Sequence, residues 1–166
     1  MIKKRYSSSF SFKKTNVKKE EKPNLKLDFV GLIDPEKNLG QSVMYGKIDF
    51  PKNKSLKKGW YVIHPKEIAN KTIKEDASLL YLGKAPLKGI KVYLANRYFK
   101  GIGEVLAETI VDDGNMDSLR VIRGESFKIK DRFKLKDEHA QSIQEGWQKT
   151  KDTAYYDILL NELGFS

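Results

Sequence analysis

Hydrophobic residues follow two different periodicities along this chain, and the change comes near residue 85. Before it, they fall in short runs rich in β-branched and aromatic residues ("LKLDFVGLI", "SVMYGKIDF", "GWYVIHP", "SLLYLG"), separated by turn-forming Asp-Pro, Pro-Lys-Asn and Gly. Lys26 and Asp28 alternate with apolar neighbours, as in a strand with one exposed face. The pattern predicts a small antiparallel β module over residues 24–84, which could form a partial barrel and could include a short helix in "HPKEIANKT".

Beyond residue 85 the apolar spacing becomes helical. "PLKGIKVYLAN" places Leu87, Ile90 and Leu94 on one face, and "EVLAETIV" follows the same spacing. We expect Asn115 to cap a short helix, since Asn is a preferred N-cap residue. The amphipathic segments "DEHAQSIQEGWQ" and "DTAYYDILLNELGFS" complete a predicted all-α domain over residues 85–166. The expected fold class is therefore α+β, with a β module followed by an all-α domain.

Charge is unevenly distributed over the chain, whose formal net charge is +10. Residues 1–22 hold eight Lys/Arg against two Glu, whereas residues 137–166 hold two Lys against six Asp/Glu. We expect residues 1–23 to form a flexible basic tail, which either attracts phosphate or only aids solubility. A basic surplus that stops before the C-terminal segment suits a polyanionic partner, and DNA is the leading candidate. A generally lysine-rich surface is the alternative.

The amino-acid composition argues against several classes of function. The chain has no cysteine and two distant histidines, His64 and His139, so we expect no disulfide, no metal site and no cofactor. No apolar run approaches the length of a membrane span, and the expected location is cytoplasmic, with the nucleoid when bound to DNA. Gly46-Lys47 and Gly83-Lys84 lack the rest of the G-x-x-x-x-G-K-[ST] phosphate loop. We therefore expect this chain not to be an enzyme.

Two glycines flank Ile102 in "RYFKGIGEVLAETIV". Between helices they leave room only for a tight turn, and they permit positive φ and close approach of a ligand. We expect Ile102 to point inward, and the helix after Gly103 to present unpaired N–H groups and the positive end of its dipole to an anion. The predicted phosphate contacts are the backbone amides of Gly101, Gly103 and Val105, with Lys100 adding charge.

Together with Phe99, Ala107 and Ile110, these residues resemble the helix-hairpin-helix DNA-binding motif, hydrophobic-x-Gly-Ile-Gly-x-x-x-Ala-x-x-Ile. The resemblance implies binding to the DNA backbone through main-chain amides, without reading of sequence. A tight turn that serves packing alone is the alternative. Glu104 departs from what a DNA contact favours, because its carboxylate would stand beside the phosphate unless it turned aside.

A second copy of the pattern follows thirty-three positions downstream. Lys134, Leu135 and Lys136, followed by Ala140 and Ile143, repeat the spacing of the first hairpin with both glycines replaced by lysine. Two interpretations stay open for this degenerate hairpin. Either Lys134 and Lys136 contact phosphate through their side chains, or the hairpin is purely structural.

From Leu87 to Ser166, about half the chain, the segments "LKGIKVYLANRYFKGIGEVLAETIVDDG", "SLRVI", "HAQSIQEGW" and "YYDILLNELGFS" follow one another in an order that resembles the N-terminal region of RecD-like (RecD/TraA-type) ATP-dependent DNA helicases. That family places a small β domain before tandem helix-hairpin-helix units and two motor domains. The resemblance implies a DNA-binding accessory region acting in repair or recombination, with a helicase motor in cis or in trans. Lacking a phosphate loop, the chain would be a fragment of such a helicase or a separate accessory protein.

Specific residues of the chain also fit other functions. A DNA glycosylase would use an aspartate after the hairpin, and Asp112, Asp113 and Asp117 follow it. A protein-interaction adaptor could use the apolar faces around Trp147, Tyr155, Tyr156, Leu159 and Leu160. The aromatic residues of the β module either stack on bases or pack in the core. They are Phe29, Tyr45, Phe50, Trp60, Tyr61 and Tyr81.

Overall fold

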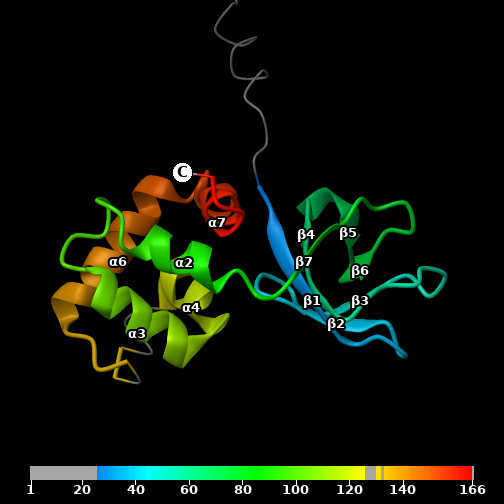
Figure 1. The fold of residues 1–166 in the computed structure, drawn as a ribbon, viewed down its shortest axis with the longest axis horizontal. Helices are drawn as coiled ribbons and strands as arrows, with labels where there is room; N and C mark the ends of the chain where they lie inside the picture. Colours follow the sequence, from blue (N-terminus) through cyan, green and yellow to red (C-terminus); the bar gives the residue numbers. More distant parts are fainter. Residues whose placement is uncertain (1–25, 126–129, 132, 166) are drawn as a thin grey trace, which may run out of the picture.

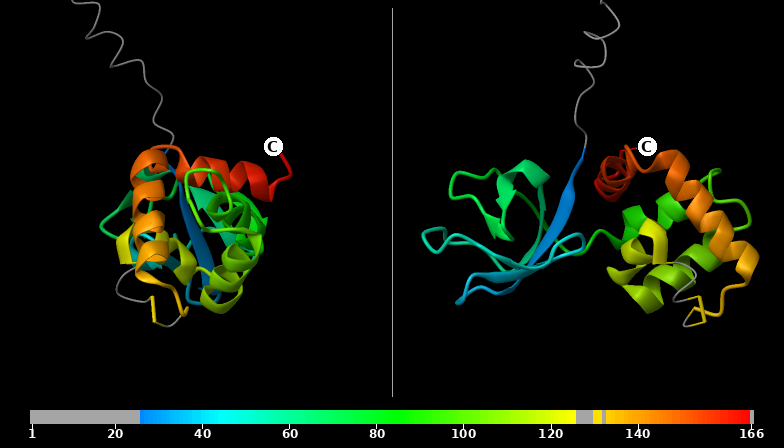
Figure 2. Two further views of the ribbon diagram at one scale, coloured as in Figure 1. Left: turned by 90° about the vertical axis from the view of Figure 1, so that its left-hand side faces the viewer. Right: turned by 180° about the vertical axis from the view of Figure 1, so that it is seen from behind.

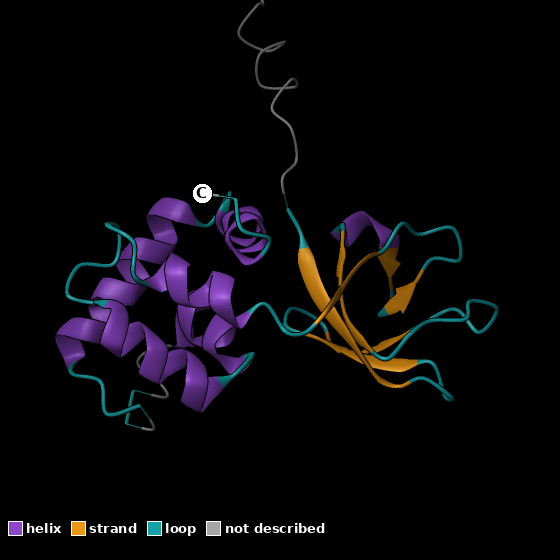
Figure 3. Ribbon diagram, viewed as in Figure 1, coloured by secondary structure: helices purple, strands orange, loops and turns teal. Residues whose placement is uncertain are grey.

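The computed structural model describes residues 26–125, 130–131 and 133–165. A curled sheet and a group of helices lie side by side and are joined by one connection after the last strand (Figure 1). Figure 3 shows that the strands precede the helices along the chain, apart from one short helical turn within the sheet half. The predicted α+β fold class is confirmed. The expected tail, residues 1–23, lies outside the described residues.

The sheet contains seven strands in the order β5-β6-β3-β2-β1-β4-β7. Neighbouring strands are antiparallel except for the short parallel pair β3–β6. The strands are β1 (Asp28–Asp34), β2 (Leu39–Ser42), β3 (Gly46–Asp49), β4 (Gly59–Ile63), β5 (Ile68–Ala69), β6 (Thr72–Ile73) and β7 (Leu80–Gly83).

The short helix expected in "HPKEIANKT" is wrong for most of that segment. Only η2 (Pro65–Glu67), a single 3₁₀ turn, forms there, and the rest is the β5–β6 hairpin. The two residues between these strands, Asn70 and Lys71, both take positive φ, at 51° and 60°. Such a two-residue turn matches the twist of the strands on either side, so the local chain closes a hairpin rather than continuing as a helix.

Strand β1 is buried on both faces. Phe29 belongs to the apolar cluster that includes the helices, whereas Val30 and Leu32 pack with Ile48 inside the curl of the sheet. The expectation of an exposed polar face is wrong for Asp28, which is fully buried. The reason is that the helical part covers one face of the sheet while the curl closes over the other, so β1 has no solvent-facing side near its start.

The helical part consists of α2 (Leu87–Leu94), α3 (Glu104–Gly114), α4 (Asp117–Arg120), the π turn η3 (Val121–Glu125), α6 (Asp137–Thr150) and α7 (Ala154–Glu162). Asn115 does not cap α4 as expected; it ends α3 at a φ of 53°, and Met116 occupies the N-cap position of α4. With a ψ of −134° the backbone leaves the helical region at Asn115, and Asn is among the non-glycine residues enriched at positive φ.

Two close helix contacts depend on glycine. A Cβ at Gly89 of α2 would lie 2.1 Å from the carbonyl oxygen of Ile158 in α7. A Cβ at Gly146 of α6 would lie 2.5 Å from the ring of Phe99, which precedes the first hairpin turn. Glycine at these two positions therefore allows α7 to pack closely against α2, and α6 to pack closely against the first hairpin. Within the described ranges, no helix is both long and apolar enough to cross a bilayer.

Candidate nucleic-acid interface

The turn between α2 and α3 lies at the end of the helical part that faces away from the sheet (Figures 1 and 2). Gly101 takes a φ of 80°, and Gly103 is extended at φ −86° and ψ −176° in the N-cap position of α3. Between them Ile102 is only 3% exposed, so it points inward as predicted. The predicted start of the helix at Glu104 is also confirmed. The sequence therefore builds the expected turn.

The backbone amides of this turn have few internal partners. Ile102 N donates to the Phe99 carbonyl at 3.1 Å, and Ala107 N donates to the Gly103 carbonyl at 2.9 Å. Within the described part of the chain, the amides of Gly101, Gly103 and Val105 have no hydrogen-bond acceptor. A Cβ at Gly103 would meet nothing within 4 Å, and one at Gly101 would meet only a His139 carbon at 4.0 Å. The amides thus lie at an open surface at the positive end of α3.

Charged and aromatic side chains surround the turn. Lys100 and Glu104 are both exposed on either side of the glycines. Arg97 was not among the expected contacts, yet it lies in the same connection, with its guanidinium 5.1 Å from the Tyr98 ring centroid and 3.2 Å from the Tyr98 hydroxyl. In the sequence, the only indication that Arg97 lies near the turn is its position four residues before Gly101. Glu104 lies beside the turn, and Glu138 and Glu145 line the same pocket as Lys100 and Gly101, so Arg97 and Lys100 share this region with three carboxylates.

The degenerate second hairpin keeps the backbone conformation of the first. Lys134 takes a φ of 56°, Leu135 is 6% exposed, and Lys136 is extended in the N-cap position of α6. Two of its amides, however, are occupied. Lys136 N donates to His139 Nδ1 at 3.3 Å, and Lys134 N donates to the Asp131 carbonyl at 3.2 Å. The second hairpin therefore offers fewer main-chain donors to an anion than the first, and its exposed lysine side chains are its main groups for phosphate.

The two hairpins lie against each other. The Ser142 hydroxyl of α6 donates a hydrogen bond to the Lys100 carbonyl, and His139 is the nearest side chain to Gly101. These contacts join the N-terminal part of α6 to the first turn. Lys100, Lys134 and Lys136 are consequently carried by one connected region of the helical part, and each of them is exposed.

The aspartates considered for catalysis are engaged elsewhere. Asp112 pairs with Lys91 at 2.9 Å and ties α3 to α2, while Asp117 pairs with Arg120 at 3.9 Å. In the described ranges no group of three or more His, Cys, Asp or Glu residues is placed to hold a metal ion.

The aromatic residues of the β module divide between core and surface. Phe29, Phe50 and Tyr61 are buried and pack in the core, whereas Trp60 is partly exposed and Tyr81 is 44% exposed. The apolar residues of the helices that could serve an adaptor divide likewise, since Tyr155 and Leu159 are buried and Tyr156 is 37% exposed.

A buried carboxyl lies where the sheet meets the helices. Asp28 accepts hydrogen bonds from the Ser42 hydroxyl and from Phe29 N, the latter at 2.8 Å. Arg123 approaches from the helical part, and its guanidinium donates to the Val43 carbonyl at 2.7 Å. Burial raises the pKa of Asp28 to about 6, against the lowering effects of Ser42, Phe29 N–H and Arg123.

No protein-family model matches this chain, and neither the curated proteins nor the solved structures contain a match to it. The interpretation of the hairpin accordingly depends on its own geometry and chemistry.

Proposed function

We propose that this chain is a sequence-nonspecific DNA-binding module that holds the phosphate backbone at the helix-hairpin-helix turn. The observation that carries the proposal is that the amides of the exposed residues Gly101, Gly103 and Val105, at the N-terminus of α3, have no acceptor in the described part of the chain. By its resemblance to RecD-like helicases, the module would be the N-terminal accessory region of such an enzyme. It would act in the cytoplasm on DNA in repair or recombination, with the motor in cis or in trans.

The chemistry of the turn suits a phosphate. Backbone N–H groups at a helix N-terminus donate to anionic oxygens, and the helix dipole favours negative charge at the same place. Glycine at both positions lets a sugar-phosphate chain approach without meeting a side chain. Lys100 beside the turn, with Lys134 and Lys136 on the second hairpin, adds long-range attraction. Since every nucleotide carries the same phosphate, such contacts position the protein without reading bases.

A protein-interaction adaptor in a DNA-processing complex is the second candidate. It is favoured by two exposed apolar side chains on the helices of the first hairpin, Val92 at 45% and Val105 at 82% exposure. An adaptor of this kind would bind a protein partner through α2 and α3 and would show no affinity for DNA.

A salt-dependent titration with duplex DNA of arbitrary sequence tests the proposal. We expect the logarithm of the association constant to fall linearly with the logarithm of the salt concentration, by about 0.9 per phosphate neutralised. Replacing both Gly101→Val and Gly103→Val should remove most binding while leaving the helical circular dichroism unchanged. Gly164→Val is the matched control, because Gly164 also has positive φ and open space around it but lies after α7.

If the double variant binds duplex as well as the Gly164→Val control does, the hairpin is not the contact and the proposal fails. Tight capture of a protein partner together with no DNA binding by the unaltered chain would favour the adaptor.

A further inference from the structure

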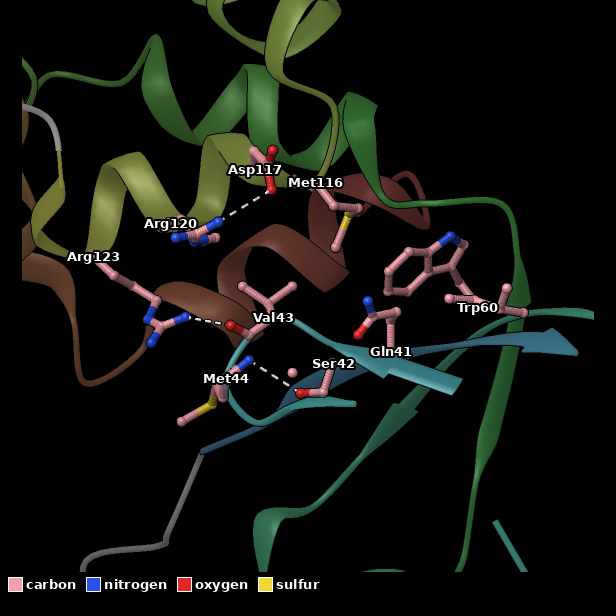
Figure 4. A pocket seen from close by; sticks show the side chains of 11 residues that line it. Gln41, Ser42, Val43, Met44, Trp60, Met116, Asp117, Arg120 and Arg123 are labelled. Carbon is pink, nitrogen blue, oxygen red and sulfur yellow. Dashed lines mark hydrogen bonds and ion pairs between the residues drawn. The ribbon is translucent and has the colours of Figure 1, made fainter. Parts of the chain in front are cut away.

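We propose that a groove between the sheet and the helical part binds single-stranded nucleic acid, independently of the hairpin turn. This junction groove consists of two pockets on either side of the β2–β3 turn, which share Met44 and Arg123. The first pocket also contains Gln41, Trp60, Met116, Asp117 and Arg120 (Figure 4), and the second also contains Lys26, Leu27, Trp147, Lys151, Asp152 and Tyr155.

Each pocket contains one of the two tryptophans of the chain. Trp60 comes from β4, where its ring lies over Gly31, and Trp147 comes from α6. Both indoles pack against the core on one side and remain partly exposed on the other. Trp147 also contacts the Tyr155 ring, with 6.2 Å between centroids. Bases stack on such rings with little regard for sequence, because every base has a π face.

Four cations and two carboxylates line the groove, which leaves a surplus of two positive charges, with Arg120 paired to Asp117 at 3.9 Å. Figure 4 shows the side chains of Arg120 and Arg123 on the helical side of the first pocket, with Trp60 on the sheet side. The hydrogen bond from Arg123 to the Val43 carbonyl holds that guanidinium at the crossing point of the two pockets. Guanidinium groups bind phosphate oxygens in defined geometry, so the groove offers charge for a backbone beside rings for its bases.

The same features favour a single strand over a duplex. In a duplex the base faces are stacked on one another, so they cannot lie against Trp60 or Trp147. Met44, 40% exposed between the two pockets, is a flexible side chain that adapts to bases of different size. A neutral peptide would gain nothing from the four cations, and an acidic one would gain little from the two indoles. Single-stranded nucleic acid uses both.

Trp60 and Trp147 are the only tryptophans in the sequence, so a change in tryptophan fluorescence reports directly on binding in this groove. The variants Trp147→Phe and Trp60→Phe each leave one emitting indole, and each would be titrated with an oligothymidylate of about 16 nucleotides. We expect quenching in both variants. Arg120→Gln should lower the salt dependence of binding, with a slope smaller by about 0.7 for the lost phosphate contact. Trp147→Leu should weaken binding at least about fivefold.

Lys66→Gln is the matched control, because it removes one exposed positive charge from η2, whose residues do not line the groove. Absence of quenching of either indole would overturn the proposal, and so would equal effects of Arg120→Gln and Lys66→Gln. Preferential binding of an acidic peptide over the oligothymidylate would also overturn it.

The hairpin variant Gly101→Val with Gly103→Val separates this proposal from the proposed function. Quenching by the single strand should survive in that variant while duplex affinity falls, in which case both proposals hold. If duplex affinity does not fall and quenching remains, the hairpin proposal fails and the groove proposal stands. If quenching is lost with the hairpin, the groove is no independent site and the inference is refuted.

Discussion

Changing Gly103→Asp should move folding stability and DNA binding in opposite directions. Gly103 occupies the N-cap position of α3 in the extended conformation that an N-cap residue normally takes, and a Cβ there meets nothing within 4 Å. An aspartate fits without strain. Its carboxylate can accept a hydrogen bond from Leu106 N or from Val105 N, and the latter is one of the groups that we propose for phosphate.

The gain in stability has three parts. A carboxylate cap improves on glycine by a few tenths of a kcal/mol, its charge at the dipole adds about 0.3–1 kcal/mol, and loss of glycine's freedom in the unfolded chain adds about 0.4–1 kcal/mol. We expect the free energy of unfolding to rise by about 1–2 kcal/mol, the sum of these parts, which corresponds to a rise of about 2–8 °C in Tm. Binding should weaken at least about tenfold, because the loss of one charge-assisted hydrogen bond costs about 1.5–3 kcal/mol.

Urea denaturation and a duplex titration on the same preparations measure both effects. Gly103→Asn is the control that separates capping from charge, because its side chain also caps α3 but carries no charge. We expect it to weaken DNA binding less than Gly103→Asp does. If Gly103→Asp raises the free energy of unfolding and leaves DNA affinity unchanged, the N-terminus of α3 is not where phosphate binds, and the reasoning is refuted.

Three further changes test the packing and electrostatics. Lys134→Gly should raise the free energy of unfolding in urea by about 0.5–1 kcal/mol, since a lysine at φ 56° is strained there. Gly89→Ala should lower it by about 3 kcal/mol in a thermal melt, because the new Cβ meets the Ile158 carbonyl oxygen at 2.1 Å. Burial raises the pKa of Asp28 from 3.8 to about 6, so the folded chain keeps a proton that the unfolded chain loses between these values. As pH rises from 4 to 6 the free energy of unfolding should therefore fall by about 2 kcal/mol, out of about 3 kcal/mol over the whole titration, and an Asp28→Asn variant should lack this slope.

Sequence predicted the hairpin well because its determinants are local. Gly101 and Gly103 set the turn, Ile102 anchors it, and the apolar spacing after residue 104 specifies the helix. Each of these signals acts within a few residues of the structure it determines. The second hairpin was predicted for the same reason, although the occupation of its amides by His139 and Asp131 was not.

Features that depend on distant residues were missed. The alternation around Asp28 is that of a half-exposed strand, and only the covering of β1 by the helical part makes this carboxyl buried. The junction groove brings Trp60, Arg120 and Trp147 together from three separate regions of the chain. Asn115 illustrates a local ambiguity, because the same residue type serves both to begin a helix and to end one.

The apolar cluster that runs from Phe29 and Val62 of the sheet to Ile90 and Ile158 of the helices has a practical consequence. A chain cut after Gly83 would expose part of this apolar cluster to solvent on each half. We therefore expect neither piece to express as a stable, monodisperse protein. A protein engineered to contain the glycine turn and its helices must therefore include the strands as well.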